Sequence, residues 1–180
     1  RSTTVYDAKD RPTVQIAPTG LRMTTLYDGG LYRQRAMIAA NGSRTSYTYN
    51  ADGQTLTSRN ALNQRTSFIY DSSGRSQGVI DARGNRTTTI FDSYGRIVAT
   101  QNALGKRWTT IYNAVGQMAA SQNPLSYRTS HVYDTAGRQV ATLQPLGQRS
   151  TRVYNKADQV VATINANNRR TTLVYDALGR

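Results

Sequence analysis

One dipeptide recurs along the whole chain: an aromatic residue followed by Asp or Asn. The aromatic residue stands at nine positions, which are Tyr6, Tyr27, Tyr49, Tyr70, Phe91, Tyr112, Tyr133, Tyr154 and Tyr175. Successive copies are 21 residues apart, except for one interval of 22 after Tyr27. A fixed period of this length is typical of repeat architectures, in which one supersecondary unit is stacked many times. This repeat constrains the fold more than any other feature of the chain.

Further residues recur in fixed columns when each aromatic residue is counted as position 0. Position +5 is Arg or Gln, and position +20 is mostly Val or Ile. Position +4 is mostly glycine, at Gly53, Gly74, Gly95, Gly116 and Gly137. Position +16 is arginine in each complete repeat, one step late in the repeat with the insertion, at Arg22, Arg44, Arg65, Arg86, Arg107, Arg128, Arg149 and Arg170.

Each repeat is predicted to contain two strands and two turns. Asp or Asn at +1 and Gly at +4 predict one turn, because Gly adopts a positive φ without steric cost. Positions +5 to +10, such as residues 96–101, predict the first strand. Positions +16 to +21, such as residues 107–112, predict the second, which is rich in Thr, β-branched and aromatic residues. Positions +11 to +15 form the opposite turn and hold Pro124 and Pro145, which could not donate to a strand ladder.

Side chains alternate between the two faces of a strand, which divides the columns between faces. In the second strand, Arg at +16, Thr or Ser at +18 and the aliphatic residue at +20 share one face, and the aromatic residue lies on the other. The pattern leaves the inward face open, because the +20 column is apolar as well. Since aromatic rings bury a large apolar area, we favour the aromatic column as the seam of the core. Eight repeat intervals predict about sixteen strands, and a twist of roughly 20 to 25° per strand predicts a rolled sheet.

Charge and residue choice restrict the chemistry. The chain has 23 Lys and Arg against 10 acidic residues, all of them Asp, and a formal net charge of +13. It has no cysteine and one histidine, His131, in the variable column +19. We expect no catalytic residue, no metal site and no cofactor, since a general base needs a positioned partner and transition metals need Cys or His ligands. No stretch is apolar enough to predict a membrane span.

The arginines at +16 allow two interpretations. The favoured one is a structural ladder, in which each guanidinium binds neighbouring turn carbonyls or an Asp at +1, because the placement is periodic and Arg suits fixed, forked contacts. The other is a basic stripe that binds nucleic acid or an anionic polysaccharide. Cations outnumber acids, so weak polyanion binding is expected in either case.

The sequence resembles the YD repeats of the Rhs (rearrangement hotspot) family. The run Tyr-Asp-Thr-Ala-Gly-Arg at 133–138 and the run Leu-Gly-Lys-Arg-Trp-Thr at 104–109 carry the signature. Such repeats occur in Rhs proteins, in the shell components of insecticidal toxin complexes and in teneurin ectodomains. The resemblance implies an all-β fold, in which tandem 21-residue β-hairpins form a rolled or spiralling antiparallel sheet that builds a shell, tube or fibre.

The resemblance also implies an organisation and a function. Residues 1–180 are expected to form a single continuous YD-repeat array of about eight repeats, a segment of a longer protein. The implied function is a structural module, not an enzyme, of a secreted or cell-surface protein that forms an extracellular fibre, tube or encapsulating shell. Adhesion through surface glycans or polyanions is the alternative. The implied partners are further repeats of the same or identical chains, an encapsulated C-terminal effector and surface glycans. The chain has neither the Asp-Pro-x-Gly motif that closes many Rhs cores nor an effector segment, so shell and fibre both stay open.

Overall fold

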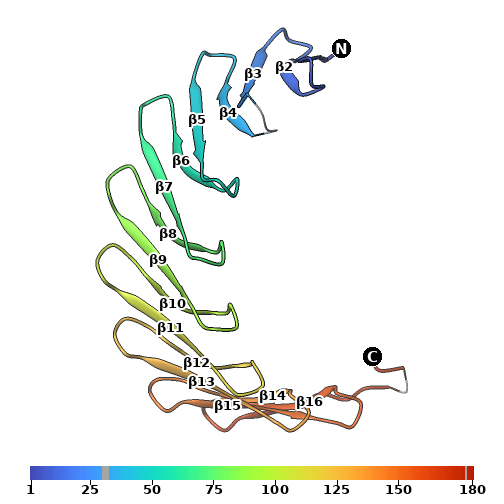
Figure 1. The fold of residues 1–180 in the computed structure, drawn as a ribbon. Helices are drawn as coiled ribbons and strands as arrows, with labels where there is room; N and C mark the ends of the chain where they lie inside the picture. The colour runs from blue at the N-terminus through green and yellow to red at the C-terminus, as the bar shows by residue number, and fades with distance from the viewer. Residues whose placement is uncertain (30–32, 177) are drawn as a thin grey trace. The chain divides into compact units, whose positions relative to one another are not determined.

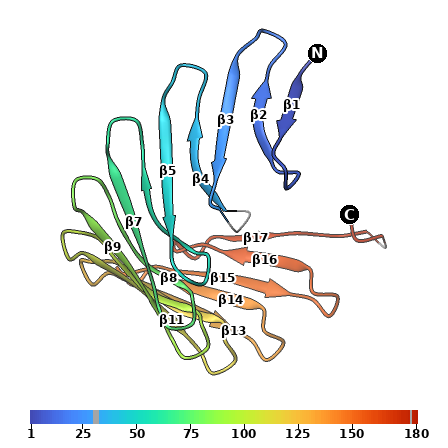
Figure 2. The same cartoon turned by 45° about the horizontal axis from the view of Figure 1, so that its top comes forward.

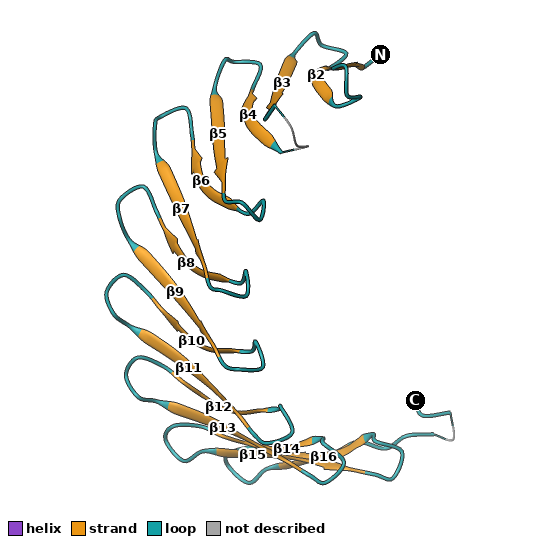
Figure 3. Ribbon diagram, viewed as in Figure 1, coloured by secondary structure: helices purple, strands orange, loops and turns teal. Residues whose placement is uncertain are grey.

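The computed structural model describes residues 1–29, 33–176 and 178–180. These residues form seventeen β-strands and no helix (Figure 3). They divide into two compact units, residues 1–89 and 90–180. Within each unit, every strand pairs antiparallel with the next strand along the chain. The prediction of an antiparallel all-β fold built from tandem hairpins is confirmed.

The strands of the first unit are β1 (Thr3–Tyr6), β2 (Pro12–Ile16), β3 (Arg22–Tyr27), β4 (Gln34–Ile38), β5 (Arg44–Tyr49), β6 (Thr55–Arg59), β7 (Arg65–Tyr70) and β8 (Ser76–Ile80). Strand β9 (Arg86–Phe91) contains the boundary between the units. The second unit continues with β10 (Ile97–Gln101), β11 (Arg107–Tyr112), β12 (Met118–Gln122), β13 (Arg128–Tyr133), β14 (Gln139–Leu143), β15 (Arg149–Tyr154), β16 (Val160–Ile164) and β17 (Arg170–Thr172) (Figure 1).

Both kinds of turn follow one design and lie along opposite margins of the sheet in each unit (Figure 2). In the +1 to +4 turn, the Gly95 amide donates to the Asp92 carbonyl at 3.0 Å, and Gly95 has a φ of 81°. The Asp92 carboxylate accepts the Arg96 amide at 2.9 Å, which ties position +5 to the turn. The even-numbered strands therefore begin at +6, one residue later than the sequence predicts. In the opposite turn, Gly105 has the same bond to Asn102 and a φ of 73°.

A β-bulge recurs where the aromatic column meets the next strand. Ile111 pairs with Ala120, but the following residue, Tyr112, pairs with Met118, so β12 carries one extra residue. The same shift occurs beside Tyr6, Tyr27, Tyr49, Tyr70, Tyr133 and Tyr154. A bulge adds local twist and changes the direction of a side chain. The bulge therefore changes the local direction of the chain beside these seven tyrosines.

The insertion in the second repeat lies in a turn. The Asp28 amide donates to the Arg33 carbonyl at 3.0 Å, the bond that position +1 makes with +5 in other repeats. Arg33 is therefore the +5 residue, and the extra residue lies between Asp28 and Arg33, a segment that includes residues 30–32, outside the described residues.

The most buried column is +8, which the sequence analysis did not single out. The buried apolar residues are Val14, Ala36, Ala99, Ala120, Ala141 and Ala162. Ala120 lies opposite Ile111 on one side and Ser130 on the other, so larger side chains flank a small one. The expectation that the aromatic column forms the core is wrong: within each unit, strands contact only their neighbours in sequence, so no second layer covers the rings.

Candidate functional site

Fourteen of the twenty arginines fall into two columns, +5 and +16, which have different environments. The arginines of the +5 column are ion-paired. Arg96 places a guanidinium nitrogen 2.8 Å from the Asp92 carboxylate, and its guanidinium carbon lies 4.4 Å from the ring centroid of Tyr112 in the next repeat. We call this arrangement of +1, +5 and the next aromatic residue the clamp. Six repeats have the ion pair, between Asp7 and Arg11, Asp28 and Arg33, Asp71 and Arg75, Asp92 and Arg96, Asp134 and Arg138, and Asp176 and Arg180.

The clamp links one repeat to the next. Arg11 donates to the Asp28 carbonyl at 3.1 Å, and Arg138 donates to the Asn155 carbonyl at 3.2 Å. In both cases the acceptor is the +1 residue of the following repeat. One guanidinium thus bridges a carboxylate, a backbone carbonyl and an aromatic ring, for which its planar set of donors is suited.

Three repeats contain a neutral form of the clamp. Asn50 donates through Nδ2 to Gln54 Oε1 at 2.9 Å, and Gln54 Nε2 donates to the Gly74 carbonyl at 2.6 Å. The pairing is strict along the chain: the six Asp residues at +1 occur with Arg at +5, and the three Asn residues occur with Gln. The neutral pairs are Asn50 with Gln54, Asn113 with Gln117, and Asn155 with Gln159.

The aromatic column completes the clamp. The Tyr112 hydroxyl donates to the Ile97 carbonyl at 3.2 Å, so each ring reaches back to the first residue of the preceding even-numbered strand. The same bond is made by Tyr27, Tyr49, Tyr70, Tyr133, Tyr154 and Tyr175. The predicted aromatic and +4 glycine columns therefore lie together at one margin of the sheet, as parts of the inter-repeat contact.

Hydrogen bonds favour the charged form of the carboxylates of Asp134 and Asp71, two members of the clamp. The side-chain hydrogen bond from Arg138 and the backbone amide of Arg138 lower the pKa of Asp134, against the opposing effect of burial. For Asp71, the backbone amide of Arg75 is the main cause of the lowered pKa, and the Arg75 side chain adds to it. Hydrogen bonds to a carboxylate favour its ionised form, so these turns keep their negative charge to lower pH than a free Asp would.

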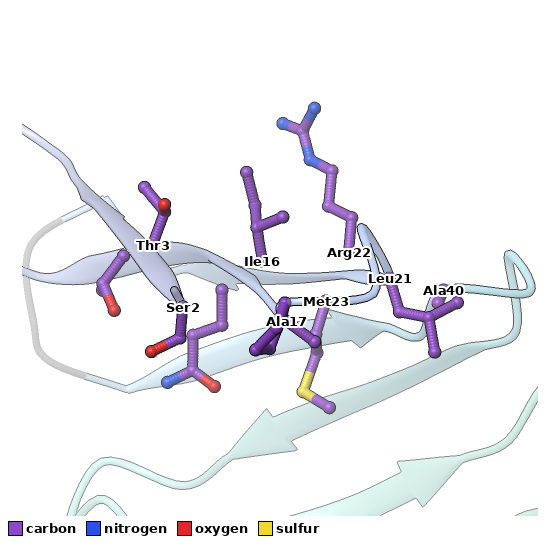
Figure 4. Close-up of a pocket in the computed structure, with 11 residues that line it drawn as sticks. Ser2, Thr3, Ile16, Ala17, Leu21, Arg22, Met23 and Ala40 are labelled. Atoms are coloured by element: carbon purple, nitrogen blue, oxygen red, sulfur yellow. The ribbon is translucent and has the colours of Figure 1, made fainter.

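The +16 arginines lie at the other margin and are exposed at the start of each odd-numbered strand. Figure 4 shows Arg22 projecting from the same side as Ile16, its partner in β2, within a pocket that Met23 lines from the opposite side. No side-chain hydrogen bond or ion pair joins the guanidinium groups of these eight arginines to any other described residue. The favoured interpretation, a ladder of +16 arginines bound to turn carbonyls and Asp, is therefore wrong: the +5 arginines make those bonds, because they adjoin the +1 turn.

Positive charge gathers at the same margin. The columns +11 to +16 contain eleven of the 23 cations and one of the ten acids, Asp81. The cations besides the +16 arginines are Arg83, Lys106 and Arg169. The Asp81 carboxylate accepts hydrogen bonds from the Asn85 side chain and from backbone amides of its own turn. Within each unit, this margin therefore presents a row of arginines that have no side-chain partner among the described residues. They lie about 10 Å apart because two strand spacings separate them.

Few other side chains in the described part of the chain are candidates for catalysis or metal binding. His131 Nδ1 is buried and has no hydrogen-bond partner among the described residues. Among those same residues, no three of His, Cys, Asp and Glu gather where they could hold a metal ion. The described part of the chain also has no helix long and apolar enough to cross a membrane.

Comparison with known proteins finds one family model that matches part of the chain and solved structures with a similar fold. The family model described as RHS Repeat matches residues 49–86. The crystal structure of TcdB2-TccC3-Cdc42 is similar over 100% of this chain and 12% of that chain, with 17% identity and a TM-score of 0.60. The Photorhabdus luminescens Tc holotoxin pore with a mutated TccC3 is similar over 99% of this chain and 13% of that chain, with 12% identity and a TM-score of 0.63. This chain thus spans about an eighth of the length of those chains. A search of curated proteins finds no match.

Proposed function

Because this chain belongs to the RHS, or YD, repeat family, we propose that it forms part of the wall of an encapsulating shell in a secreted or cell-surface protein. Its role is structural rather than catalytic. Its partners are further repeats of the parent chain and, inside the shell, a C-terminal effector. Residues 1–180 act as one continuous array within that wall.

The observation that carries the proposal is that each unit is a single layer of sheet. The buried apolar residues are one valine and five alanines, and no large side chain is fully buried in the described residues. A globular enzyme of this length would enclose a core of large apolar side chains. A one-layer sheet stabilised by contacts between neighbouring repeats instead suits an extended surface with two accessible faces.

The structural comparisons support a shell over a fibre. The similar structures are Tc toxin assemblies, and this chain matches one stretch of a much longer chain in them. A wall segment need not contain the cap or the cargo, so their absence from these residues is compatible with the proposal.

Electron microscopy of the native parent protein tests the proposal. We expect hollow particles, and we expect limited proteolysis to spare the C-terminal region until the particles are denatured. Uniform filaments, or compact particles whose C-terminal region is digested at once, would overturn it.

The exposed +16 arginines favour a second function, binding of surface glycans or other polyanions. Within the second unit, Arg107, Arg128, Arg149 and Arg170 have no ion-pair partner among the described residues. Arginine forms bidentate bonds with sulfate, phosphate and carboxylate groups. A row of such groups would attract a linear polyanion with an affinity that falls as salt rises.

Elution from a heparin column tests this second function. Replacing Arg128 and Arg149 by Gln should lower the salt concentration at elution. The matched control is Arg35→Gln with Arg152→Gln, which removes the same charge from exposed positions outside the +16 column. Equal shifts for the two double variants would show that net charge, and not the column, determines binding.

A further inference from the structure

In one hairpin, a second arginine faces the +16 column. Arg59, the last residue of β6, is the direct cross-strand partner of Arg65. In the other described hairpins, the residue opposite the +16 arginine is uncharged: Ile16, Ile38, Ile80, Gln101, Gln122, Leu143 or Ile164. Like charges directly opposite each other destabilise a sheet. Both side chains are exposed, and neither has an ion-pair or hydrogen-bond partner among the described residues.

The surroundings of this pair are polar where other repeats are apolar. Thr57 takes the +8 position, which is Ala in five other repeats, and Thr48 takes the +20 position, which is mostly Val or Ile. Their hydroxyl oxygens lie 2.7 Å apart in a hydrogen bond. Together with Ser46, these two threonines and the two arginines line one surface hollow. Three departures from the repeat pattern, at Thr48, Thr57 and Arg59, thus fall in neighbouring strands and border one hollow.

A third cation lies beside the hollow. Ser46 is the direct partner of Arg59, and Arg44 stands two residues before Ser46 on the same face of β5. Such diagonal neighbours are about 7 to 8 Å apart, within reach of long side chains. No carboxylate lines the hollow. Every residue named lies in the first unit.

We propose that this hollow binds a tetrahedral oxyanion, a phosphate or sulfate group. Two facing guanidinium groups can each donate two hydrogen bonds to such a group. The Ser46 hydroxyl and one of the two threonine hydroxyls can donate to it as well, because the proton of the other threonine hydroxyl is engaged in the bond between Thr48 and Thr57. The bound anion would neutralise the repulsion between Arg59 and Arg65. The two arginines therefore destabilise the sheet when the hollow is empty and bind the anion when it is present.

The site differs in kind from the stripe of single +16 arginines. That stripe attracts polyanions along its length, whereas this hollow selects one group of defined shape. The columns on this face, +8, +10, +16, +18 and +20, contain no aromatic residue on which a nucleotide base could stack. The recognised element is therefore the oxyanion itself, either free or as an ester.

The test is calorimetric titration and thermal unfolding of the 180-residue chain with inorganic phosphate and sulfate, at constant ionic strength, with acetate as the control anion. We expect one saturable site per chain for the tetrahedral anions. Arg59→Ile, which restores the residue of four other repeats, should melt at a higher temperature than the wild type without anion and bind phosphate at least about tenfold more weakly. Arg107→Gln, a +16 arginine opposite Gln101, should keep the wild-type affinity.

Phosphate and sulfate also stabilise proteins without binding, so the difference between variants is the informative quantity. Equal phosphate affinity of wild type and Arg59→Ile, or an equal gain in melting temperature, would overturn the proposal. So would saturable binding of acetate with the same affinity. Tighter binding of a phosphate or sulfate monoester than of the inorganic ion would assign the site to an esterified ligand, and the reverse order would assign it to the free ion. Either order supports the site, and neither depends on the parent protein forming a shell.

Discussion

Arg96 lies over the ring of Tyr112, one repeat further along the chain, with 4.4 Å between its guanidinium carbon and the ring centroid. The same guanidinium is ion-paired with Asp92 in its own repeat. This contact joins a local turn to the neighbouring hairpin, and it recurs between Arg11 and Tyr27 and between Arg138 and Tyr154. Repeats that contact only their neighbours depend on such interfaces for stability.

The two forms of the clamp should be interchangeable only as pairs. Asp92→Asn alone and Arg96→Gln alone should each lower the free energy of unfolding, because each leaves one charge without its partner. The double variant recreates the pair found at Asn50 and Gln54 and should lose less than the sum of the two single changes. Urea denaturation of the four proteins measures the coupling. Strictly additive losses would contradict a clamp that acts as a unit.

A substitution to glycine at position +14 should raise the free energy of unfolding. Ser126 has a φ of 66°, whereas Gly105 holds the same position one repeat earlier with a φ of 73°. A non-glycine residue in this left-handed region costs roughly 1 kcal/mol. Ser126→Gly should therefore raise the free energy of unfolding by about that amount, and Gly105→Ala should lower it by a similar amount. Chemical denaturation checks both signs, and a loss of stability in Ser126→Gly would show that its hydroxyl matters more than its backbone.

The buried +8 column contains one glycine, and we can predict how a methyl group added there would change the stability of the fold. Gly78 stands where five other repeats have a buried alanine, and a Cβ there would lie 3.5 Å from Ile69 Cδ1 and 3.3 Å from the Thr87 carbonyl. The alanine repeats accommodate a methyl group in this column, so Gly78→Ala should stabilise the fold by roughly 0.5 to 1 kcal/mol. Ala120→Gly is the reverse change and should cost a similar amount. A lower melting temperature for Gly78→Ala would mean that the Thr87 backbone cannot move by the few tenths of an ångström required.

Acid should weaken the charged clamps before it affects the neutral ones. Hydrogen bonds from the amide and side chain of Arg96 lower the pKa of Asp92 despite the opposing effect of burial. A carboxyl whose folded pKa is depressed stabilises the fold above its unfolded pKa, about 3.9, and this contribution is lost as the pH falls through the folded pKa. The melting temperature should therefore drop below about pH 4. The Asp92→Asn, Arg96→Gln double variant should show a smaller drop, and an identical pH profile would contradict the assignment.

Much of the local structure follows from the sequence, because it depends on residues close together in the chain. Asp or Asn at +1 and Gly at +4 predict the turn, and the structure contains it, with positive φ at Gly95 and at the exceptional Asp10. The co-occurrence of Asp with Arg and of Asn with Gln, four residues apart, is also visible in the sequence and could have identified the clamp. The small residues at +8 are a second such signal, because alanine recurs there in five repeats and small side chains fit where neighbouring strands pack closely.

The sequence alone determined the period and the two strands and two turns of each repeat, because turn and strand preferences act within a few residues. Only the tertiary structure decided which arginines are paired, since the +5 and +16 columns differ in the neighbours that the bulged register brings to them. It also decided that Ala120, and not Tyr112, is fully covered, because burial in a single layer of sheet depends on the side chains of the adjoining strands. For the same reason, the encounter of Arg59 with Arg65 is a property of strand pairing, by which two residues six apart become direct partners across a hairpin.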